Sequence, residues 1–345
     1  MTLNIKNLTG RQLLDWLDSQ GEPKFRAKQI HEWLYDHFVQ DFQAMRNLPL
    51  KLREQLARDF SATSVSAVKE QSAEDGTVKY LLELADNKTV ETVLIPQGER
   101  YTVCVSSQVG CPVGCYFCAS GQDGLERNLS IAEIVDQVLF CCAQLGRKVD
   151  NVVVMGIGEP LLNTENLIPA LNVLTDPASL NLGARRLTVS TSGIVPGMKK
   201  LADEGKQWNL ALSLHAASDS RRSRFIPDRF RYPLHDIFAA CRYYHQQTGR
   251  MVYFEYTLIK DANDAQTDAE ELAAHARKVK AKVNLIPCNP SFNNAWQPPS
   301  QDVIEAFQNT LAAKGVSSTL RQRKGCDIQA ACGQLRSHSL NAIEV

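Results

Sequence analysis

Three cysteines lie close together in the run Cys111-Pro-Val-Gly-Cys115-Tyr-Phe-Cys118. A C-x3-C-x2-C spacing on a short loop with glycine and proline brings three thiols near enough to hold one inorganic centre. Iron-sulfur cubes and structural zinc sites normally take four protein ligands. A site with three ligands either recruits a distant fourth ligand or leaves one metal ion open to a substrate. Of these two options, an open iron is the one that would allow chemistry at the metal.

Two structural explanations of these cysteines are weaker. Ten cysteines in 345 residues is a low density, whereas disulfide scaffolds are small, secreted and rich in cysteine. A zinc ribbon requires a second C-x2-C pair. The remaining cysteines never recur at that interval, and they are Cys104, Cys141, Cys142, Cys241, Cys288, Cys326 and Cys332. An RNA-binding protein that is stabilised by a cluster or by zinc and has no catalytic activity stays open as an alternative from a different class.

With Phe117 directly before its last cysteine, the loop resembles the cluster loop of radical S-adenosylmethionine (SAM) enzymes. The runs Cys104-Val-Ser-Ser-Gln-Val-Gly-Cys111 and Ala330-Ala-Cys332-Gly-Gln-Leu335 resemble segments of the RlmN/Cfr family of RNA adenine methyltransferases. This similarity extends over nearly the whole chain. It implies a 4Fe-4S cluster whose fourth iron binds SAM, and whose protein ligands are Cys111, Cys115 and Cys118.

The resemblance also implies that SAM is used twice. The C2 carbon of adenine is electron-poor and has no lone pair with which to attack a methyl group directly. In the family, a thiolate at the position of Cys332 first takes a methyl by displacement. A radical from a second SAM then removes a hydrogen from that methyl, and the carbon radical adds to adenine. By the same resemblance, Cys104 resolves the protein-RNA adduct through a disulfide with Cys332, and Glu91 is the candidate proton acceptor.

Polar residues follow several predicted strands, at the ends where ligands bind in parallel α/β folds. In Gly156-Ile-Gly158-Glu159, the glycines allow a ligand to approach the backbone, and the carboxylate can accept hydrogen bonds from an ammonium group. Each such turn or side chain alone is more often structural, but they recur at successive strand ends. By resemblance, the residues that contact SAM are Gly158, Glu159, Ser190, Ser213, Leu214, His215 and Asn289.

Two further cysteines depart from the family pattern. Cys288 stands beside Asn289 where the family usually has another residue, so the local pocket wall differs. Cys326 either is inert or competes for the disulfide.

The elements that position these residues follow a repeating order of strand and helix. Apolar strands are predicted near residues 102–106, 151–156, 186–191, 208–214, 251–258 and 282–287. Ser130 and Glu133 predict a capping box at the start of one helix. Six such units predict an α/β fold with a parallel sheet. The repeats allow either a partial (β/α)6 barrel or an open doubly wound sheet, and the resemblance implies a TIM-like radical SAM barrel.

Three segments are expected along the chain. Residues 1–63 are predicted to form a small helical domain, because apolar residues recur every four positions from Leu48 to Phe60 and Pro49 suits a helix start. The resemblance implies that this accessory domain docks RNA. Residues 64–99 are predicted to form a β-hairpin extension around Asp86-Asn87. Residues 100–345 are expected to form the core domain with the C-terminal methyl-carrier segment.

Overall charge does not indicate a nucleic-acid partner, because 38 acidic residues balance 38 basic ones. An RNA partner must therefore be recognised by local patches. Each basic run is also consistent with a solvated surface, and the run that leads into the Cys332 segment is favoured. The candidate phosphate contacts are Lys24, Arg26, Lys28, Lys51, Arg53, Arg221, Arg222, Arg224, Lys278, Lys280, Lys282, Arg321, Arg323 and Lys324.

The chain shows no apolar run of signal-peptide length and no stretch of about 18 apolar residues. We therefore expect a cytoplasmic protein with reduced thiols, no membrane association and a monomeric state. The resemblance implies 23S rRNA as substrate, tRNA as a further substrate, and an electron donor such as flavodoxin.

These observations predict a radical SAM methyltransferase that acts on C2 of adenosine. Gly158-Glu159-Pro160 and Ser190-Thr-Ser192-Gly193 resemble the C2 members of the family. Tyr232-Pro233 resembles the members that methylate C8 of an rRNA adenine, the modification associated with ribosomal antibiotic resistance. C8 methylation is therefore the alternative within the family.

Overall fold

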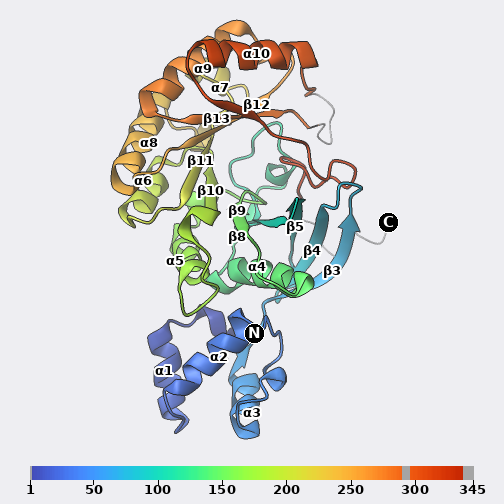
Figure 1. Cartoon of the computed structure of the whole chain (residues 1–345), viewed down its shortest axis with the longest axis vertical. Helices are drawn as coiled ribbons and strands as arrows, with labels where there is room; N and C mark the ends of the chain where they lie inside the picture. The colour runs from blue at the N-terminus through green and yellow to red at the C-terminus, as the bar shows by residue number, and fades with distance from the viewer. Residues whose placement is uncertain (1, 290–295, 337–345) are drawn as a thin grey trace.

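One ten-stranded sheet runs through the computed structural model, which describes residues 2–289 and 296–336 (Figure 1). The strand order is β14-β13-β12-β11-β10-β9-β6-β5-β4-β3. The parallel strands are β6 (Arg100–Val105), β9 (Asn151–Val154), β10 (Leu187–Thr191), β11 (Asn209–Ser213), β12 (Tyr253–Leu258), β13 (Lys282–Pro287) and β14 (Ser318–Leu320).

The order of the parallel strands decides between the two predicted architectures. In the parallel part of the sheet, β6 pairs with β9, and each strand from β9 to β13 pairs with the strand numbered next after it. A doubly wound sheet would reverse its strand order at a switch point, and the series shows no reversal. The partial barrel is therefore confirmed. All six predicted strands are present, and β14 is a seventh that the sequence analysis missed because it is only three residues long.

The predicted hairpin is confirmed and forms part of the same sheet. β4 (Val78–Leu84) and β5 (Thr89–Gln97) pair antiparallel around Asp86-Asn87, and β3 (Val65–Ser72) pairs with β4. β5 also pairs antiparallel with β6. The antiparallel strands thus extend the barrel sheet on one side, which brings Glu91 on β5 near the first barrel strand. A separate small sheet joins β7 (Gln108–Gly110) to β8 (Leu125–Asn128).

Helices cover the outer face of the parallel strands (Figure 1). They are α4 (Ile131–Leu145), α5 (Thr164–Thr175), α6 (Val195–Asp203), α7 (Asp219–Arg222), α8 (Leu234–Thr248), α9 (Gln266–Val279) and α10 (Gln301–Ala313). The predicted capping box starts α4, since Glu133 N donates to Ser130 Oγ and Ser130 N donates to Glu133 Oε2. Short 3-10 turns lie at Ile5–Asn7, Phe42–Ala44, Ala119–Gly121, Pro160–Leu162, Ala184–Arg186 and Asp228–Phe230.

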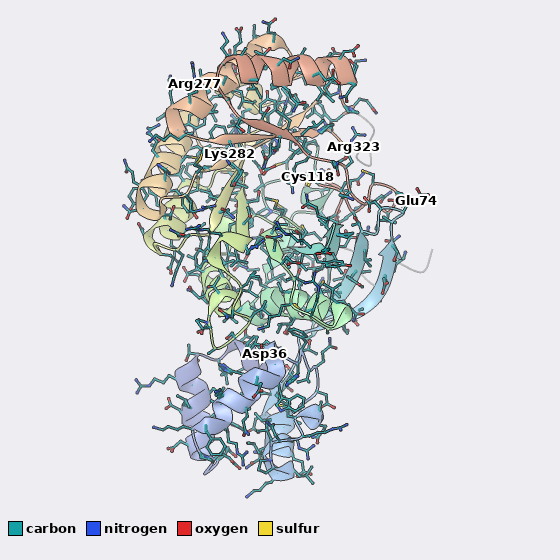
Figure 2. The ribbon with its side chains drawn as sticks, viewed as in Figure 1. Asp36, Glu74, Cys118, Arg277, Lys282 and Arg323 are labelled. Atoms are coloured by element: carbon teal, nitrogen blue, oxygen red, sulfur yellow. The ribbon has the colours of Figure 1, made fainter. Side chains whose placement is uncertain are left out.

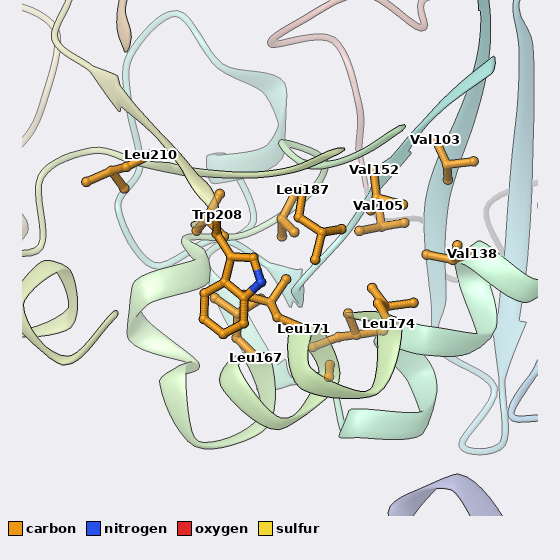
Figure 3. Packing of buried hydrophobic residues seen from close by; sticks show 14 of the residues in the cluster. Val103, Val105, Val138, Val152, Leu167, Leu171, Leu174, Leu187, Trp208 and Leu210 are labelled. Atoms are coloured by element: carbon orange, nitrogen blue, oxygen red, sulfur yellow. The ribbon is translucent and has the colours of Figure 1, made fainter. Parts of the chain in front are cut away.

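The core lies between the strands and these helices (Figure 3). Val103 and Val105 from β6 and Val152 from β9 are fully buried beside Leu171 of α5 and Val138 of α4. Burial of such side chains stabilises the fold by roughly 1.5–3 kcal/mol each. The strand and helix periods of the sequence therefore specify a common core, and the polar residues that follow the strands stay outside it.

The N-terminal helices form a lobe beneath α4 (Figure 1). They are α1 (Gly10–Ser19), α2 (Phe25–Tyr35) and α3 (Leu50–Asp59), and β1 (Leu3–Asn4) pairs parallel with β2 (Phe60–Ser61). Lys6 from this lobe forms a buried ion pair with Asp136 of α4, at 2.7 Å from Nζ to Oδ1. No helix within the described residues is long and apolar enough to cross a membrane.

Candidate active site

The C-terminal ends of the parallel strands surround one cavity with about 1000 Å³ of empty space, including its open mouth. This is the end at which ligands bind in barrel folds. The predicted residues that line the cavity are Cys111, Cys115, Cys118, Gly158, Glu159, Ser190, Ser213, His215, Asn289 and Cys332. Three predicted residues do not line it: Leu214, which is fully buried, Cys104 and Glu91.

Glycines and backbone hydrogen bonds shape the cysteine loop. Gly110 has a φ of 76°, and a Cβ added there would lie 2.0 Å from the carbonyl oxygen of Gly124. Cys111 N donates to that same oxygen at 2.8 Å, and Tyr116 N donates to Phe225 O at 3.0 Å. The loop is therefore anchored at both ends to other segments, and the intervening thiols turn toward the cavity.

The chemistry of the loop fits the implied cluster. Burial raises the pKa of the Cys111 thiol to about 12, and burial together with the neighbouring thiols raises the pKa of Cys115 well above its usual range. Thiols in such surroundings keep their protons until a metal displaces them. Among the described residues, no three His, Cys, Asp or Glu side chains converge on a single ion. A cube of four irons does not need such convergence, because each thiolate binds a different iron.

Glu159 is held with its carboxylate at the cavity wall. It is 3% exposed, its Oε1 accepts from Leu161 N at 3.1 Å, and its Oε2 accepts from Ser192 N at 2.7 Å. Burial raises the pKa of this carboxyl, although the backbone donors act against that rise. Gly158 precedes it with a φ of 110°, and a Cβ there would lie 2.7 Å from Gln108 Cβ. Only glycine therefore allows the turn that brings Glu159 to the cavity.

His215 is a neutral hydrogen-bond donor. Thr257 N donates to its Nδ1 at 3.1 Å, so the ring proton is on Nε2. Burial, with the charge of Arg222, lowers its pKa to about 3. The ring packs edge-on against Phe117 of the cysteine loop, with centroids 4.9 Å apart.

The hydroxyls of two neighbouring strand ends also meet at the cavity. Ser190 Oγ lies 3.2 Å from Ser213 Oγ. These hydroxyls, His215 and Glu159 give the cavity both donors and acceptors for a charged and polar ligand.

The Cys332 segment closes one side of the cavity. Asn289 Nδ2 donates to Cys332 O at 3.1 Å, Ala119 N donates to Gly333 O at 2.8 Å, and Ser120 Oγ donates to Leu335 O at 2.6 Å. The segment is thereby attached to the end of the cysteine loop. The Cys332 side chain itself is exposed.

Cys104 and Cys332 line a second, smaller cavity together with Cys118. Cys104 lies on β6 and is buried, and that burial raises its pKa to about 12. All ten cysteines, which lie within the described residues, are free thiols. The tertiary structure thus brings together the two thiols that the sequence separates by more than 200 residues.

Glu91 occupies a different environment from the cavity residues. Its Oε1 pairs with Lys79 Nζ at 2.9 Å, and its Oε2 accepts from Arg336 N at 2.8 Å. The side chain is buried. Glu91 therefore lies against the segment that follows Cys332 and not among the residues that line the cavity.

Two arginines that were predicted to contact RNA phosphates occupy other environments in the structure. Arg222 is fully buried, so it cannot contact RNA phosphates. Arg321 lines the main cavity, with Nη1 3.4 Å from Glu255 Oε2 and 3.7 Å from Met155 Sδ. Its pKa is raised chiefly by the nearby Cys332 thiol. Sequence reasoning missed Glu255, although an acid inside the apolar strand Tyr253–Leu258 was a usable signal.

Other basic residues do lie at accessible positions. Arg323 and Lys324 line a third cavity, which also reaches Cys332. Arg323 donates to Cys288 O at 3.1 Å. Figure 2 shows Arg323 and Cys118 in the barrel part of the molecule, away from the N-terminal lobe that carries Asp36. Cys326 is exposed, with Sγ 3.7 Å from Asn289 Oδ1.

Known proteins match the chain in both its parts. The radical SAM superfamily matches residues 105–273, and the ribosomal RNA large subunit methyltransferase N-terminal domain matches residues 3–61. A radical SAM methyltransferase from Sphaerobacter thermophilus has a similar structure, with a TM-score of 0.93 and 44% identity over 96% of this chain and 99% of that one. The chain is a radical SAM enzyme, whose cofactors are a 4Fe-4S cluster and SAM.

Curated relatives define the family more narrowly. A probable dual-specificity RNA methyltransferase RlmN from Geobacillus kaustophilus is 48% identical over 339 residues, which are 97% of this chain and 92% of the relative. A protein of the same name from Thermosynechococcus vestitus is 44% identical over 331 residues, 96% of this chain and 97% of the relative. The chain belongs to the RlmN family of SAM-dependent RNA methyltransferases. The predicted family, fold class, enzyme class and cofactors are thus confirmed.

Proposed function

We propose that this enzyme methylates C2 of an adenosine in 23S rRNA, and in tRNA as a further substrate, through a methyl group carried on Cys332. One observation carries the proposal: Cys332 lines the main cavity with the three loop cysteines and a second cavity with Cys104. A methyl carrier must meet the methyl donor on one side and its resolving thiol on the other. These two cavities satisfy both needs.

The proposed cofactor site uses residues already described. Cys111, Cys115 and Cys118 hold the cluster, and Glu159, His215 and Asn289 contact SAM. When bound, the cluster supplies the electron for reductive cleavage of SAM. The carboxylate of Glu159 suits an ammonium group, and Nε2–H of His215 suits an acceptor on the ligand, because the donor on Thr257 already occupies Nδ1.

The proposed thiol chemistry follows from the surroundings of the two cysteines. Cys332 is exposed and lines the same cavity as the three loop cysteines, so its sulfur is accessible to SAM bound there. Cys104 stays protonated until the adduct forms, since burial raises its pKa to about 12. Its sulfur then attacks Cys332 Sγ of the adduct, so that the S–S bond forms while the S–CH2 bond to the base breaks, and the released carbon takes up a proton to become the methyl group. Glu91 is the proposed proton acceptor.

RNA would reach Cys332 through the third cavity, with Arg323 and Lys324 at its wall. The helical unit of residues 1–63 is the proposed docking domain, and Lys24, Lys28 and Lys51 on it are exposed. We also propose that the enzyme works in the cytoplasm as a monomer, with an electron donor such as flavodoxin.

The test is anaerobic methylation by the full chain with reconstituted iron and sulfide. SAM, a reductant, and 23S rRNA or tRNA are added, and mass spectrometry of the digested RNA separates 2-methyladenosine from 8-methyladenosine. We expect 2-methyladenosine. 8-Methyladenosine would replace the proposal with the alternative within the family, and cleavage of SAM without any RNA product would refute both.

Thiol variants test the carrier mechanism separately. Cys332→Ala should abolish RNA methylation, and Cys104→Ala should trap a covalent protein-RNA complex that is visible by denaturing electrophoresis. Cys326→Ala is the matched control, because it removes an exposed thiol close to Asn289 without removing either reacting sulfur. Normal methylation by Cys332→Ala would contradict the proposal.

A further inference from the structure

A fully buried arginine lies behind the cysteine loop. Arg222 ends α7 and is 0% exposed. Its Nη2 donates to Ser192 O, and its Nη1 donates to Tyr232 O at 3.3 Å. Its Nε is buried without a hydrogen-bond partner, and no carboxylate within the described part of the chain forms an ion pair with it. A buried charge is costly unless an opposite charge accompanies it, so this site calls for an anion.

The segment after Arg222 packs directly on the cysteine loop. Phe225 O accepts from Tyr116 N at 3.0 Å, within the C-x3-C-x2-C run. Phe225 and Ile226 are fully buried in one apolar cluster with Val113, and Cys115 packs against that cluster. The segment that begins at Arg222 is therefore attached to the cysteine loop, and Ser192, whose carbonyl accepts from the guanidinium, also lines the cavity.

The charged groups around Arg222 include a cysteine of the loop and two carboxylates. Burial lowers its pKa to about 10, and the charge of Cys115 is the largest influence in the opposite direction. Asp219 and Glu159 act in the same direction as Cys115, and Arg231 acts against them. Asp219 Oδ1 already accepts from Leu234 N at 3.0 Å. Cys115 belongs to the loop on which the segment after Arg222 packs, so a thiolate formed there on cluster binding would bring negative charge near the guanidinium.

Ser192 connects this cation to the cavity wall. Its carbonyl accepts from Arg222, and its N–H donates to Glu159 Oε2 at 2.7 Å. These two hydrogen bonds through Ser192 fix the guanidinium of Arg222 relative to the carboxylate of Glu159.

We propose that Arg222 is the buried counter-charge of the iron-sulfur cluster and raises the reduction potential of that cluster. The inference rests on the part of the proposed function that assigns the cluster to Cys111, Cys115 and Cys118. Three thiolates bring negative charge to the partly buried cysteine loop, and reduction adds one more negative charge. A fixed cation nearby stabilises the reduced form most, because charge interactions are strong in a low dielectric. Net charge around a cluster is among the factors that set its potential.

The experiment measures the midpoint potential of the reconstituted cluster in the full chain by electron paramagnetic resonance, without SAM or RNA. R222M replaces the guanidinium with an apolar side chain, a kind of change that buried charges often tolerate. R222Q is a second neutral variant, R222K retains the charge, and R224M removes an exposed charge from the same segment. We expect a more negative potential in R222M and R222Q, little change in R222K, and none in R224M.

Several results would overturn the inference. An unchanged potential in a neutral variant that keeps the wild-type circular dichroism and iron content would do so. Unfolding of both neutral variants would also do so, because the guanidinium would then be needed for its bonds to Ser192 and Tyr232.

Methylation assays separate this inference from the proposed function. A wild-type enzyme that methylates RNA while R222M keeps the wild-type potential refutes only the role of Arg222. A shifted potential in R222M, together with no RNA product from the wild-type enzyme, refutes only the proposed reaction.

Discussion

Two buried polar regions of this molecule differ in how completely their groups are paired. At the junction of the N-terminal lobe and the barrel, Asp136 accepts from Asn4 Nδ2 at 3.0 Å and from Ser64 N at 2.7 Å, and pairs with Lys6 at 2.7 Å. At the strand ends, by contrast, Ser107 Oγ, Ser192 Oγ and Arg222 Nε are buried without partners.

The contrast concerns these two regions, because unpartnered buried atoms also occur elsewhere, at Thr77 Oγ1, Trp208 Nε1 and Arg250 Nε. Buried polar atoms in proteins are normally paired, and a shortfall calls for a specific explanation. At the junction, the carboxylate of Asp136 has all its partners within the protein and needs no bound ligand. If the strand-end site holds the proposed cofactors, its residues should affect chemistry more than stability. The following predictions test that contrast.

The largest expected effect is on the cysteine loop. Cys115→Ala should reduce both cluster iron and RNA methylation to background, because the cluster would lose one of its three proposed protein ligands. The melting temperature of the iron-free chain should change little. Iron assays, methylation assays and thermal unfolding measure these three quantities, and a large loss of stability in the iron-free variant would remove the contrast with the junction.

The next effect concerns the junction. Asp136→Ala should destabilise the protein by about 3–5 kcal/mol, because Lys6 would remain buried without its partner. Urea unfolding of the iron-free chain measures this free energy. Glu165→Ala breaks an exposed ion pair with Lys200 and should cost no more than about 1 kcal/mol. Equal effects of the two changes would contradict the distinction.

A smaller effect concerns pH. The pKa of His215 is lowered to about 3, so below the usual value of 6.5 the unfolded chain binds a proton that the folded chain does not. Stability is thus lost as pH falls, by roughly 1.4 kcal/mol per pH unit from His215 alone between about pH 6.5 and 3. His215→Asn should lose less stability between pH 6.5 and 5, and asparagine tolerates the φ of 56° at this position. If the unfolding free energies of the wild type and of His215→Asn fell equally between pH 6.5 and 5, this assignment would be refuted.

The smallest effect concerns RNA affinity. If Arg323 and Lys324 contact phosphates, replacing both with glutamine should reduce the salt slope of RNA binding by roughly 0.9 log units for each duplex contact. Titrations at several salt concentrations measure the slope. Lys200→Gln is the surface control, and a slope identical to the wild type would exclude both residues as phosphate contacts.

Much of the fold could be predicted because its signals are local. The strands β6 and β9 to β13, the hairpin at Asp86-Asn87 and the capping box at Ser130 all follow from neighbouring residues. β14 was missed, because three residues carry too little periodicity. The choice of a barrel over a doubly wound sheet depended on the order of strand pairing, which no single segment contains.

The sequence by itself determined the chemistry available to this protein, because the spacing of Cys111, Cys115 and Cys118 places three thiols on one short loop through covalent geometry alone. Only the tertiary structure decided which charged side chains lie near those thiols. Arg222 and Arg321 belong to basic runs that read as surface, yet one is buried behind the loop and the other lines the cavity beside Cys332. The physical reason is that exposure depends on packing between segments far apart in the chain, whereas ligand spacing depends only on neighbours.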